Sequence, residues 1–226
     1  MLITVVRDLV EGHKLSDKNE KGRLDPSVLG NVFEMTINHI SSSDENDTPS
    51  QKKEGAYYTP SDVIRLINRQ TVDPVVYDIL VDTYSKNLSE NTNMGKEDAE
   101  ELVREYELGE MLRQIEQREG YFGDPESLHE AYNRLGELKI VDPACGSGHF
   151  LTGAFDELHR VRMSLLRGLE GEELDDERVY EAKKELVLNS IYGVDVNPIA
   201  IEIAKLRVWL KMVEEGWETS YGELPN

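Results

Sequence analysis

The sequence is poor in cysteine and in positive charge. Among its 226 residues there is one cysteine, Cys145, which excludes an internal disulfide and the common cysteine zinc sites. Only 25 Lys and Arg stand against 45 Asp and Glu, so the formal net charge is −20. That is the wrong sign for a surface that grips nucleic-acid phosphates. If the protein acts on nucleic acid, we expect another part of it to hold the strand.

Long apolar runs are also lacking. No stretch approaches the roughly 20 residues that a membrane-spanning helix needs. The opening MLITVVRDLV reaches Arg7 and Asp8 too soon for a signal peptide. We therefore expect a cytoplasmic globular protein with no membrane partner.

The first half of the chain predicts helices and a polar loop. Asp25 as cap and Pro26 as first residue predict a helix over residues 25–40, and residues 41–55 form a polar loop. Thr59 or Ser61 can cap a further helix. Residues 95–119 predict a single amphipathic helix with one apolar side, made of Leu102, Val103, Tyr106, Leu112 and Ile115.

In the second half of the chain the spacing of the apolar residues changes, so that strands and helices alternate. The run ELKIVDPA predicts a short strand that Pro143 ends, and apolar residues at helical spacing predict a helix from near His149. A charged loop follows over residues 168–177. Helix VYEAKKELVLNS, strand IYGVD and helix NPIAIEIAKLRVWLKMV complete the order, with Asn197 as cap and Pro198 as first residue of the last helix. This order is typical of the start of a wound α/β sheet.

Two acids and two glycines gather at the predicted strand ends. In such folds ligands bind at the carboxyl ends of parallel strands. Gly146 and Gly148 permit a sharp turn and close approach of a ligand, beside the free N–H groups of the next helix. Asp142 and Asp195 end the two strands, and an acid at the end of the second strand suits the two hydroxyls of a ribose.

Two phosphate-binding motifs fail on specific residues. The dinucleotide fingerprint needs a third glycine where Leu151 stands. A phosphate loop spaced on Gly148 and Gly153 needs Lys and Ser or Thr where Ala154 and Phe155 follow. A ribose-bearing ligand without phosphates remains, and S-adenosylmethionine fits.

Three segments carry a family resemblance. DPACGSGHFL resembles motif I of the amino-directed DNA methyltransferases, IYGVDVNPIAIEIAKLRVWL resembles the segment that follows it, and GAYYTP resembles motif X. Their order, motif X first, is similar to that of the N6-adenine enzymes of bacterial and archaeal restriction-modification or phage-defence systems. The match runs from about Gly55 to Lys211.

The resemblance implies a fold, a cofactor and partners. It implies a Rossmann-like S-adenosylmethionine-dependent methyltransferase sheet after a helical N-terminal region, with residues 1–119 forming that region and residues 120–226 the first part of the cofactor-binding α/β domain. DNA would be the substrate, with specificity or nuclease subunits as further partners, in the cytoplasm of a prokaryote. The implied cofactor-binding residues are Tyr57, Tyr58, Thr59, Pro60, Asp142, Pro143, Ala144, Gly146, Gly148, Phe150, Asp195 and Val196.

One family motif is absent from these residues. The catalytic tetrapeptide, Asn or Asp followed by two prolines and an aromatic, would come after the next strands, where the sequence offers only Pro225. We therefore assign no catalytic residue and no metal, and expect residues 1–226 alone to be inactive.

Plainer interpretations of the same residues stay open. Asp195 can cap the turn before Asn197, Asp142 can fix the glycine turn, and Phe150 and the two tyrosines can be core residues. The acceptor can also be RNA, protein or a small molecule, and a non-catalytic module that binds S-adenosylmethionine is a further alternative.

Overall fold

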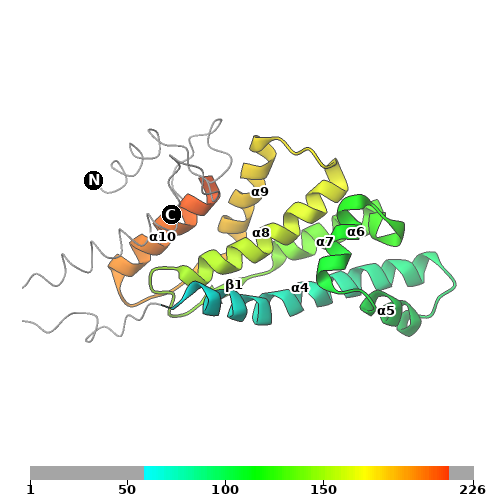
Figure 1. Ribbon diagram of the computed structural model, residues 1–226, viewed down its shortest axis with the longest axis horizontal. Helices are drawn as coiled ribbons and strands as arrows, with labels where there is room; N and C mark the ends of the chain where they lie inside the picture. The colour runs from blue at the N-terminus through cyan, green and yellow to red at the C-terminus, as the bar shows by residue number, and fades with distance from the viewer. Residues whose placement is uncertain (1–58, 214–226) are drawn as a thin grey trace, which may run out of the picture.

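The computed structural model describes residues 59–213 of the chain (Figure 1). The predicted helix over residues 25–40, the loop over residues 41–55, and Tyr57 and Tyr58 lie outside this part. Its elements are α4 (Ser61–Asn91), α5 (Lys96–Arg104), α6 (Leu108–Gln117), η1 (Gly120–Gly123), α7 (Pro125–Glu137), β1 (Ile140–Asp142), α8 (His149–Glu170), α9 (Asp176–Asn189), β2 (Ile191–Gly193) and α10 (Pro198–Val213).

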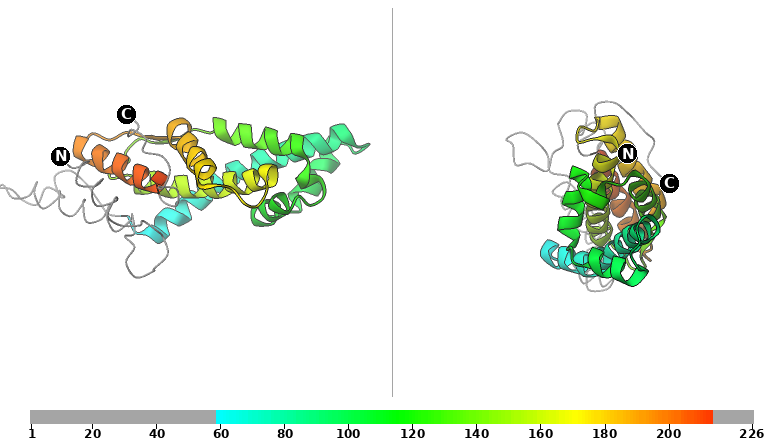
Figure 2. Two further views of the ribbon diagram at one scale, coloured as in Figure 1. Left: turned by 90° about the horizontal axis from the view of Figure 1, so that it is seen from above. Right: turned by 90° about the vertical axis from the view of Figure 1, so that its right-hand side faces the viewer.

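Helix α4 extends along the long axis of the described residues (Figures 1 and 2). Its N-cap position belongs to Pro60, whose carbonyl accepts from the amides of Val63 and Ile64. The prediction that Thr59 or Ser61 caps this helix was therefore wrong. The proline ring fixes φ, and Pro60 has φ −57° and ψ 142°, outside the helical region, as is usual just before the first turn of a helix.

The predicted helix over residues 95–119 is two helices, α5 and α6. The chain breaks around Tyr106, whose ring packs edge-on against Phe122 at 5.2 Å between centroids. The break lets α5 pack on α4 while α6 packs on α8. A single helix cannot meet both, so tertiary packing overrides the amphipathic period here.

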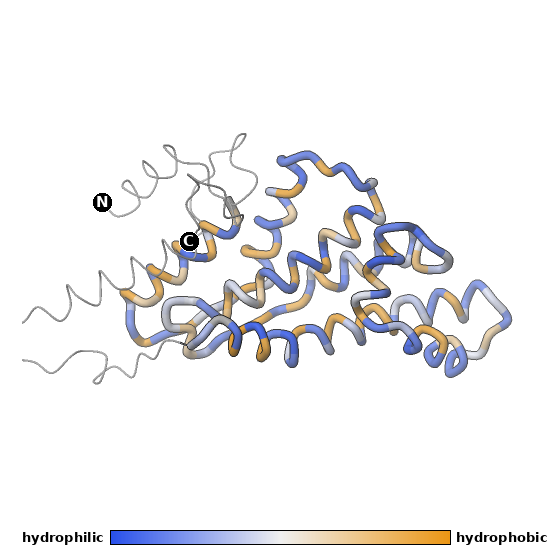
Figure 3. Tube along the Cα trace, viewed as in Figure 1, coloured by the Kyte–Doolittle hydropathy of each residue, from blue (hydrophilic) through white to orange (hydrophobic). Residues whose placement is uncertain are grey.

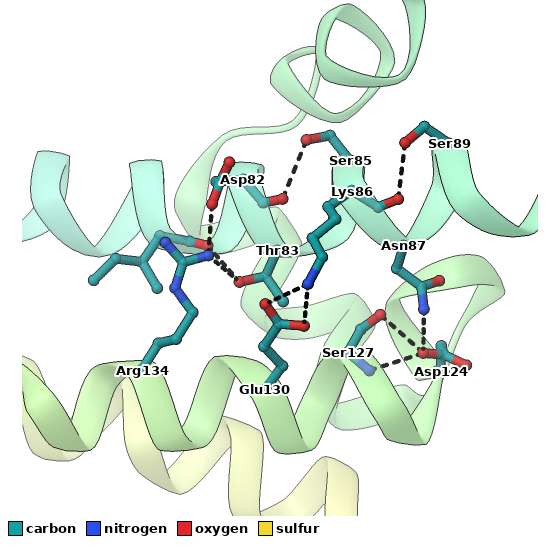
Figure 4. A network of polar contacts seen from close by, with 11 residues as sticks. Asp82, Thr83, Ser85, Lys86, Asn87, Ser89, Asp124, Ser127, Glu130 and Arg134 are labelled. Carbon is teal, nitrogen blue, oxygen red and sulfur yellow. Dashed lines mark hydrogen bonds and ion pairs between the residues drawn. The ribbon is translucent and has the colours of Figure 1, made fainter. Parts of the chain in front are cut away.

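Polar contacts fasten α7 to α4 (Figure 4). Arg134 donates to Asp82 (2.7 Å) and to Thr83 (2.9 Å), and Lys86 pairs with Glu130 (3.2 Å). Asp124 caps α7 by accepting from the backbone amide of Ser127 at 2.8 Å. These contacts lie mostly at the surface, so the apolar core beneath them supplies most of the stability.

Helix α8 packs against the most elements: α4, α6, α7, α9 and α10 all contact it. Phe155, Leu158, Leu165 and Leu166 of α8 are fully buried. Apolar and polar positions alternate within the helices instead of forming long apolar runs (Figure 3). Over residues 59–213, none of the helices is both long and apolar enough to cross a membrane.

The predicted strands β1 and β2 are present and pair in parallel, with Val141 opposite Tyr192 and Asp142 opposite Gly193. The predicted helices α8 and α10 follow them, and α9 starts at Asp176, earlier than its apolar pattern suggested. The described residues thus form a mostly helical structure with a small two-stranded parallel sheet. The larger Rossmann-like sheet stays a prediction.

Candidate functional site

The loop between β1 and α8 turns on two glycines. Gly146 and Gly148 have φ angles of 53° and 83°, in the left-handed region that favours glycine. A Cβ atom on Gly148 would lie 2.8 Å from the Cβ of Ala204, so α10 approaches α8 closely at this point. Next to Gly146, no atom lies within 4 Å of the place where a Cβ would be. The loop is therefore closed on the side of α10 and open beside Gly146.

Asp195 ties this loop to the end of β2. One carboxylate oxygen accepts from the backbone amide of Gly146 and the other from that of Asn197, each at 2.8 Å. Two backbone bonds extend the same link: Val194 donates to the carbonyl of Asp142, and Cys145 donates to that of Val194, each at 2.9 Å. The two strand ends therefore form one hydrogen-bonded unit.

Asp142 fixes the first turn of the loop. Its carboxylate accepts from the backbone amide of Ala144 at 3.0 Å, which is the turn role that the sequence allowed. The predicted cap at Asn197 is also confirmed, since its side-chain oxygen accepts from the amide of Ile199 at 2.9 Å. Both acids thus hold backbone groups, and a role toward a ligand would come in addition.

The other predicted site residues differ in exposure. Pro143, Ala144 and Pro60 are exposed, Val196 is 100% exposed, and Phe150 and Thr59 are partly buried. Thr59 and Pro60 lie directly before α4, which packs against α8. Tyr57 and Tyr58 lie outside the described residues.

Cys145 is a buried turn residue. Burial, and then the negative charges of Asp142 and Asp195, raise the pKa of its thiol above the usual value. A thiolate is therefore disfavoured here, as expected of a residue that is not a nucleophile. Within residues 59–213 no three His, Cys, Asp or Glu side chains gather as a metal site would require.

A pocket of about 280 Å³ lies between β2, α9 and α10 and borders the glycine loop at Cys145. Its lining includes the apolar side chains of Ile191, Ile201 and Val208, the polar Lys205, and Cys145 of the glycine loop. Asp195, Gly146 and Gly148 are not among the lining residues. The pocket therefore does not coincide with the predicted site, which remains on the glycine loop because the directed polar groups are there.

Two further residues of this region, Asn68 and Gly153, were not predicted as site residues from the sequence. Asn68 lies in α4 and is buried against Gly153 of α8. The only local signal is a polar residue in the row Ile64, Asn68, Val72, whose other two members are buried and apolar. Such a row indicates a buried polar contact but does not name its partner.

The glycine turn lies between a strand and a helix, and an acid that follows the neighbouring parallel strand contacts it. This is the arrangement found at the ligand-binding edge of α/β proteins. Residues 115–221 match the family described as "MmeI, DNA-methyltransferase domain". The chain is a relative of the DNA methyltransferases of restriction-modification systems.

Individual relatives agree with this family. A protein of Methanocaldococcus jannaschii assigned by its name as a type II restriction enzyme and methyltransferase is 31% identical over 204 residues, covering 88% of this chain and 15% of the relative. The adenine-specific methyltransferase PglX of Streptomyces coelicolor is 43% identical over 84 residues, 36% of this chain and 6% of its own. The type I restriction enzyme MjaIX methylase subunit of M. jannaschii is 29% identical over 161 residues, 68% of this chain and 24% of the subunit.

The chain therefore spans between 6% and 24% of the length of these relatives. No solved structure gives a significant match.

Proposed function

We propose that the chain is the S-adenosylmethionine-binding portion of a DNA adenine N6-methyltransferase of a restriction-modification system. The observation that carries the proposal is the contact between Asp195 and Gly146. An acid from the end of β2 is held on the glycine loop that follows β1, where a nucleoside ligand of a parallel sheet binds. The relatives supply the reaction class, since their names include an adenine-specific DNA methyltransferase.

The residues present fit the cofactor. Each oxygen of Asp195 accepts one backbone amide and keeps a lone pair, so the carboxylate can still accept both ribose hydroxyls. The open space beside Gly146 admits a ligand against the backbone. The first amides of α8 face the same loop and carry the positive end of the helix dipole.

Each predicted residue then has a task. Asp195 would hold the ribose, and Asp142 keeps the loop in shape through Ala144. Val196 is fully exposed beside Asp195 and would flank the bound nucleoside. The remaining proposed contacts are Tyr57, Tyr58, Thr59, Pro60, Pro143, Gly148 and Phe150.

The bound cofactor supplies an activated methyl group, and this chain's residues bind and orient it. Residues 1–226 contain no Asn/Asp-Pro-Pro-aromatic tetrapeptide. In the proposed reaction an extruded adenine presents its amino group to the donor, and that amino group needs acceptors which hold it in line. We therefore assign the donor side of the reaction to this chain and no catalytic residue.

We further propose a division of tasks along the chain. Residues 1–119 would form a helical N-terminal region and residues 120–226 the first part of the cofactor-binding α/β domain, which would belong to a larger Rossmann-like sheet. DNA would be the substrate, with specificity or nuclease subunits as partners. The names of the relatives, a combined restriction enzyme and methyltransferase and a type I methylase subunit, support these partners.

Calorimetry with S-adenosylmethionine and its demethylated product S-adenosylhomocysteine tests the proposal. We expect the chain to bind both, and Asp195→Ala to weaken binding by about 10-fold or more, because hydrogen bonds to a charged group are lost. Asp175→Ala is the matched control, since Asp175 also accepts a backbone amide, that of Arg178 at 2.7 Å, at the start of α9. Full affinity in Asp195→Ala would exclude the ribose role.

A further inference from the structure

Helix α4 approaches the backbone of α8 at Gly153. A Cβ atom there would lie 2.3 Å from Nδ2 of Asn68 and 2.9 Å from Cγ2 of Ile64. Both α4 residues are buried, each with 5% of its surface exposed. Glycine at position 153 is therefore a condition for the present position of α4.

Asn68 supplies the polar part of this contact. Its Nδ2 donates to the backbone carbonyl of Phe150 at 3.4 Å. Phe150 lies in the first turn of α8, which follows Gly148 directly. A buried amide costs free energy unless it is hydrogen-bonded, and an apolar side chain in this row could not make the bond. The contact therefore joins α4 to the very turn of α8 that follows the glycine loop.

The glycine loop lies between two helices that meet α8 on different sides. α10 meets α8 at Gly148 and α4 meets it at Gly153. Figure 1 shows the same arrangement, with α10 and α4 on opposite sides of α8. α10 follows Asp195, and α4 follows Thr59 and Pro60.

We infer that Asn68 is a positioning residue of the donor site. Its contacts with Phe150 and Gly153 fix the first turns of α4 along α8. Thr59 and Pro60 then border the glycine loop on the side away from Asp195. The inference rests on the proposed function. With the ribose on Asp195, the amino-acid end of the cofactor would be the part that reaches toward Thr59 and Pro60, and the adenosine part would stay beside Asp195. Asn68 would therefore affect binding of the amino-acid end of the ligand and not of its nucleoside.

Two ligands separate this role from general stability. S-adenosylhomocysteine carries the amino-acid end and adenosine lacks it. We expect Asn68→Ala to weaken S-adenosylhomocysteine binding by about 3- to 10-fold, the equivalent of one lost hydrogen bond, and to leave adenosine binding unchanged. Asn68→Asp is nearly isosteric but puts an acceptor that can carry a negative charge opposite the carbonyl of Phe150, so its selective loss should be at least as large.

Ser85→Ala is the matched control. Ser85 is a buried polar residue of the same helix, with 1% of its surface exposed, and it donates only within α4, to the carbonyl of Asp82 at 3.3 Å. Its substitution should alter stability, measured by urea unfolding, without changing the affinity for either ligand. If Asn68→Ala does not fold, Asn68→Asp decides.

Three outcomes would overturn the inference in distinguishable ways. Unchanged S-adenosylhomocysteine affinity in both Asn68 variants would exclude the positioning role. An equal loss for both ligands would assign Asn68 to stability alone. A parent chain that binds neither ligand would overturn the proposed donor site, and the role of Asn68 with it.

Discussion

Gly148 and Ala204 lie so close together that the Cβ atom of any other residue at position 148 would be 2.8 Å from the Cβ of Ala204. Two separate constraints therefore fix glycine here, since the φ angle of 83° also disfavours a side chain. The contact holds the start of α8 against α10.

We predict that Gly148→Ala lowers the free energy of unfolding by about 2 kcal/mol or more, from left-handed backbone strain of about 1–2 kcal/mol and the overlap with Ala204. Urea unfolding measures the loss. Gly109→Ala in α6 is the control, because nothing lies within 4 Å of a Cβ there and alanine favours a helix. Gly148→Ala and Gly109→Ala variants of equal stability would contradict this account.

Tyr84 and Tyr77 form a matched pair in α4. Each hydroxyl donates to a backbone carbonyl at 3.2 Å, that of Phe122 for Tyr84 and that of Arg104 for Tyr77, but only the first bond is buried. We predict that Tyr84→Phe destabilises the protein by about 1–2 kcal/mol, because it leaves a buried carbonyl without this donor. Tyr77→Phe should cost less than about 0.5 kcal/mol. Equal midpoints of urea unfolding for the two variants would contradict this account.

His159 makes stability depend on pH. Burial, followed by the positive charge of nearby Lys183, lowers the pKa of His159 to about 3, and its ring stacks on Phe155 at 5.7 Å. In the unfolded chain His159 takes up a proton near pH 6.5, whereas in the folded chain it stays neutral down to a much lower pH. The free energy of unfolding therefore falls as the pH drops from 6.5 toward 3.

Between pH 7.5 and pH 5 the parent chain should therefore lose about 1–2 kcal/mol more than His159→Phe. Urea unfolding at both pH values measures the difference, which subtracts the effect of the many carboxylates common to both proteins. Parallel pH dependences would show that His159 titrates normally.

The net charge of −20 gives a prediction about DNA. Non-specific binding requires clustered Lys and Arg that release counterions, and here 25 bases are outnumbered by 45 acids. We expect fluorescence anisotropy at moderate salt to show little binding of duplex DNA by this chain, with or without S-adenosylmethionine. Tight binding that weakens steeply with added salt would reveal a basic surface that the composition hides.

The elements around the site could be predicted because their signals are local. A β-branched run that Pro143 ends predicted β1, and the Asn197–Pro198 pair predicted the start of α10. The link between Asp195 and Gly146 follows less directly, from the rule that parallel strands end at one edge. It required the two strands to be neighbours, which β1 and β2 are.

The rest depends on contacts between distant residues. The break at Tyr106 follows from its packing on Phe122, although the amphipathic period continues through it. Asn68 and Gly153 meet because α4 crosses α8, and neither residue carries a motif. The N-cap position of α4 belongs to Pro60, so neither Thr59 nor Ser61 caps the helix with its side chain.

The central position of α8 has a consequence for how the protein unfolds. One buried cluster joins Val76 and Leu80 of α4, Ile115 of α6 and Leu135 of α7 to Phe155 of α8 and Leu186 of α9, so it crosses the boundary proposed between residues 119 and 120. The two regions would have different tasks but would unfold together as one cooperative unit. Amides in α4 and α8 should exchange with solvent through the same global opening, and a calorimetric scan should show one transition. A destabilising substitution in the helical region would thus reduce cofactor binding, because it lowers the folded fraction of the whole chain.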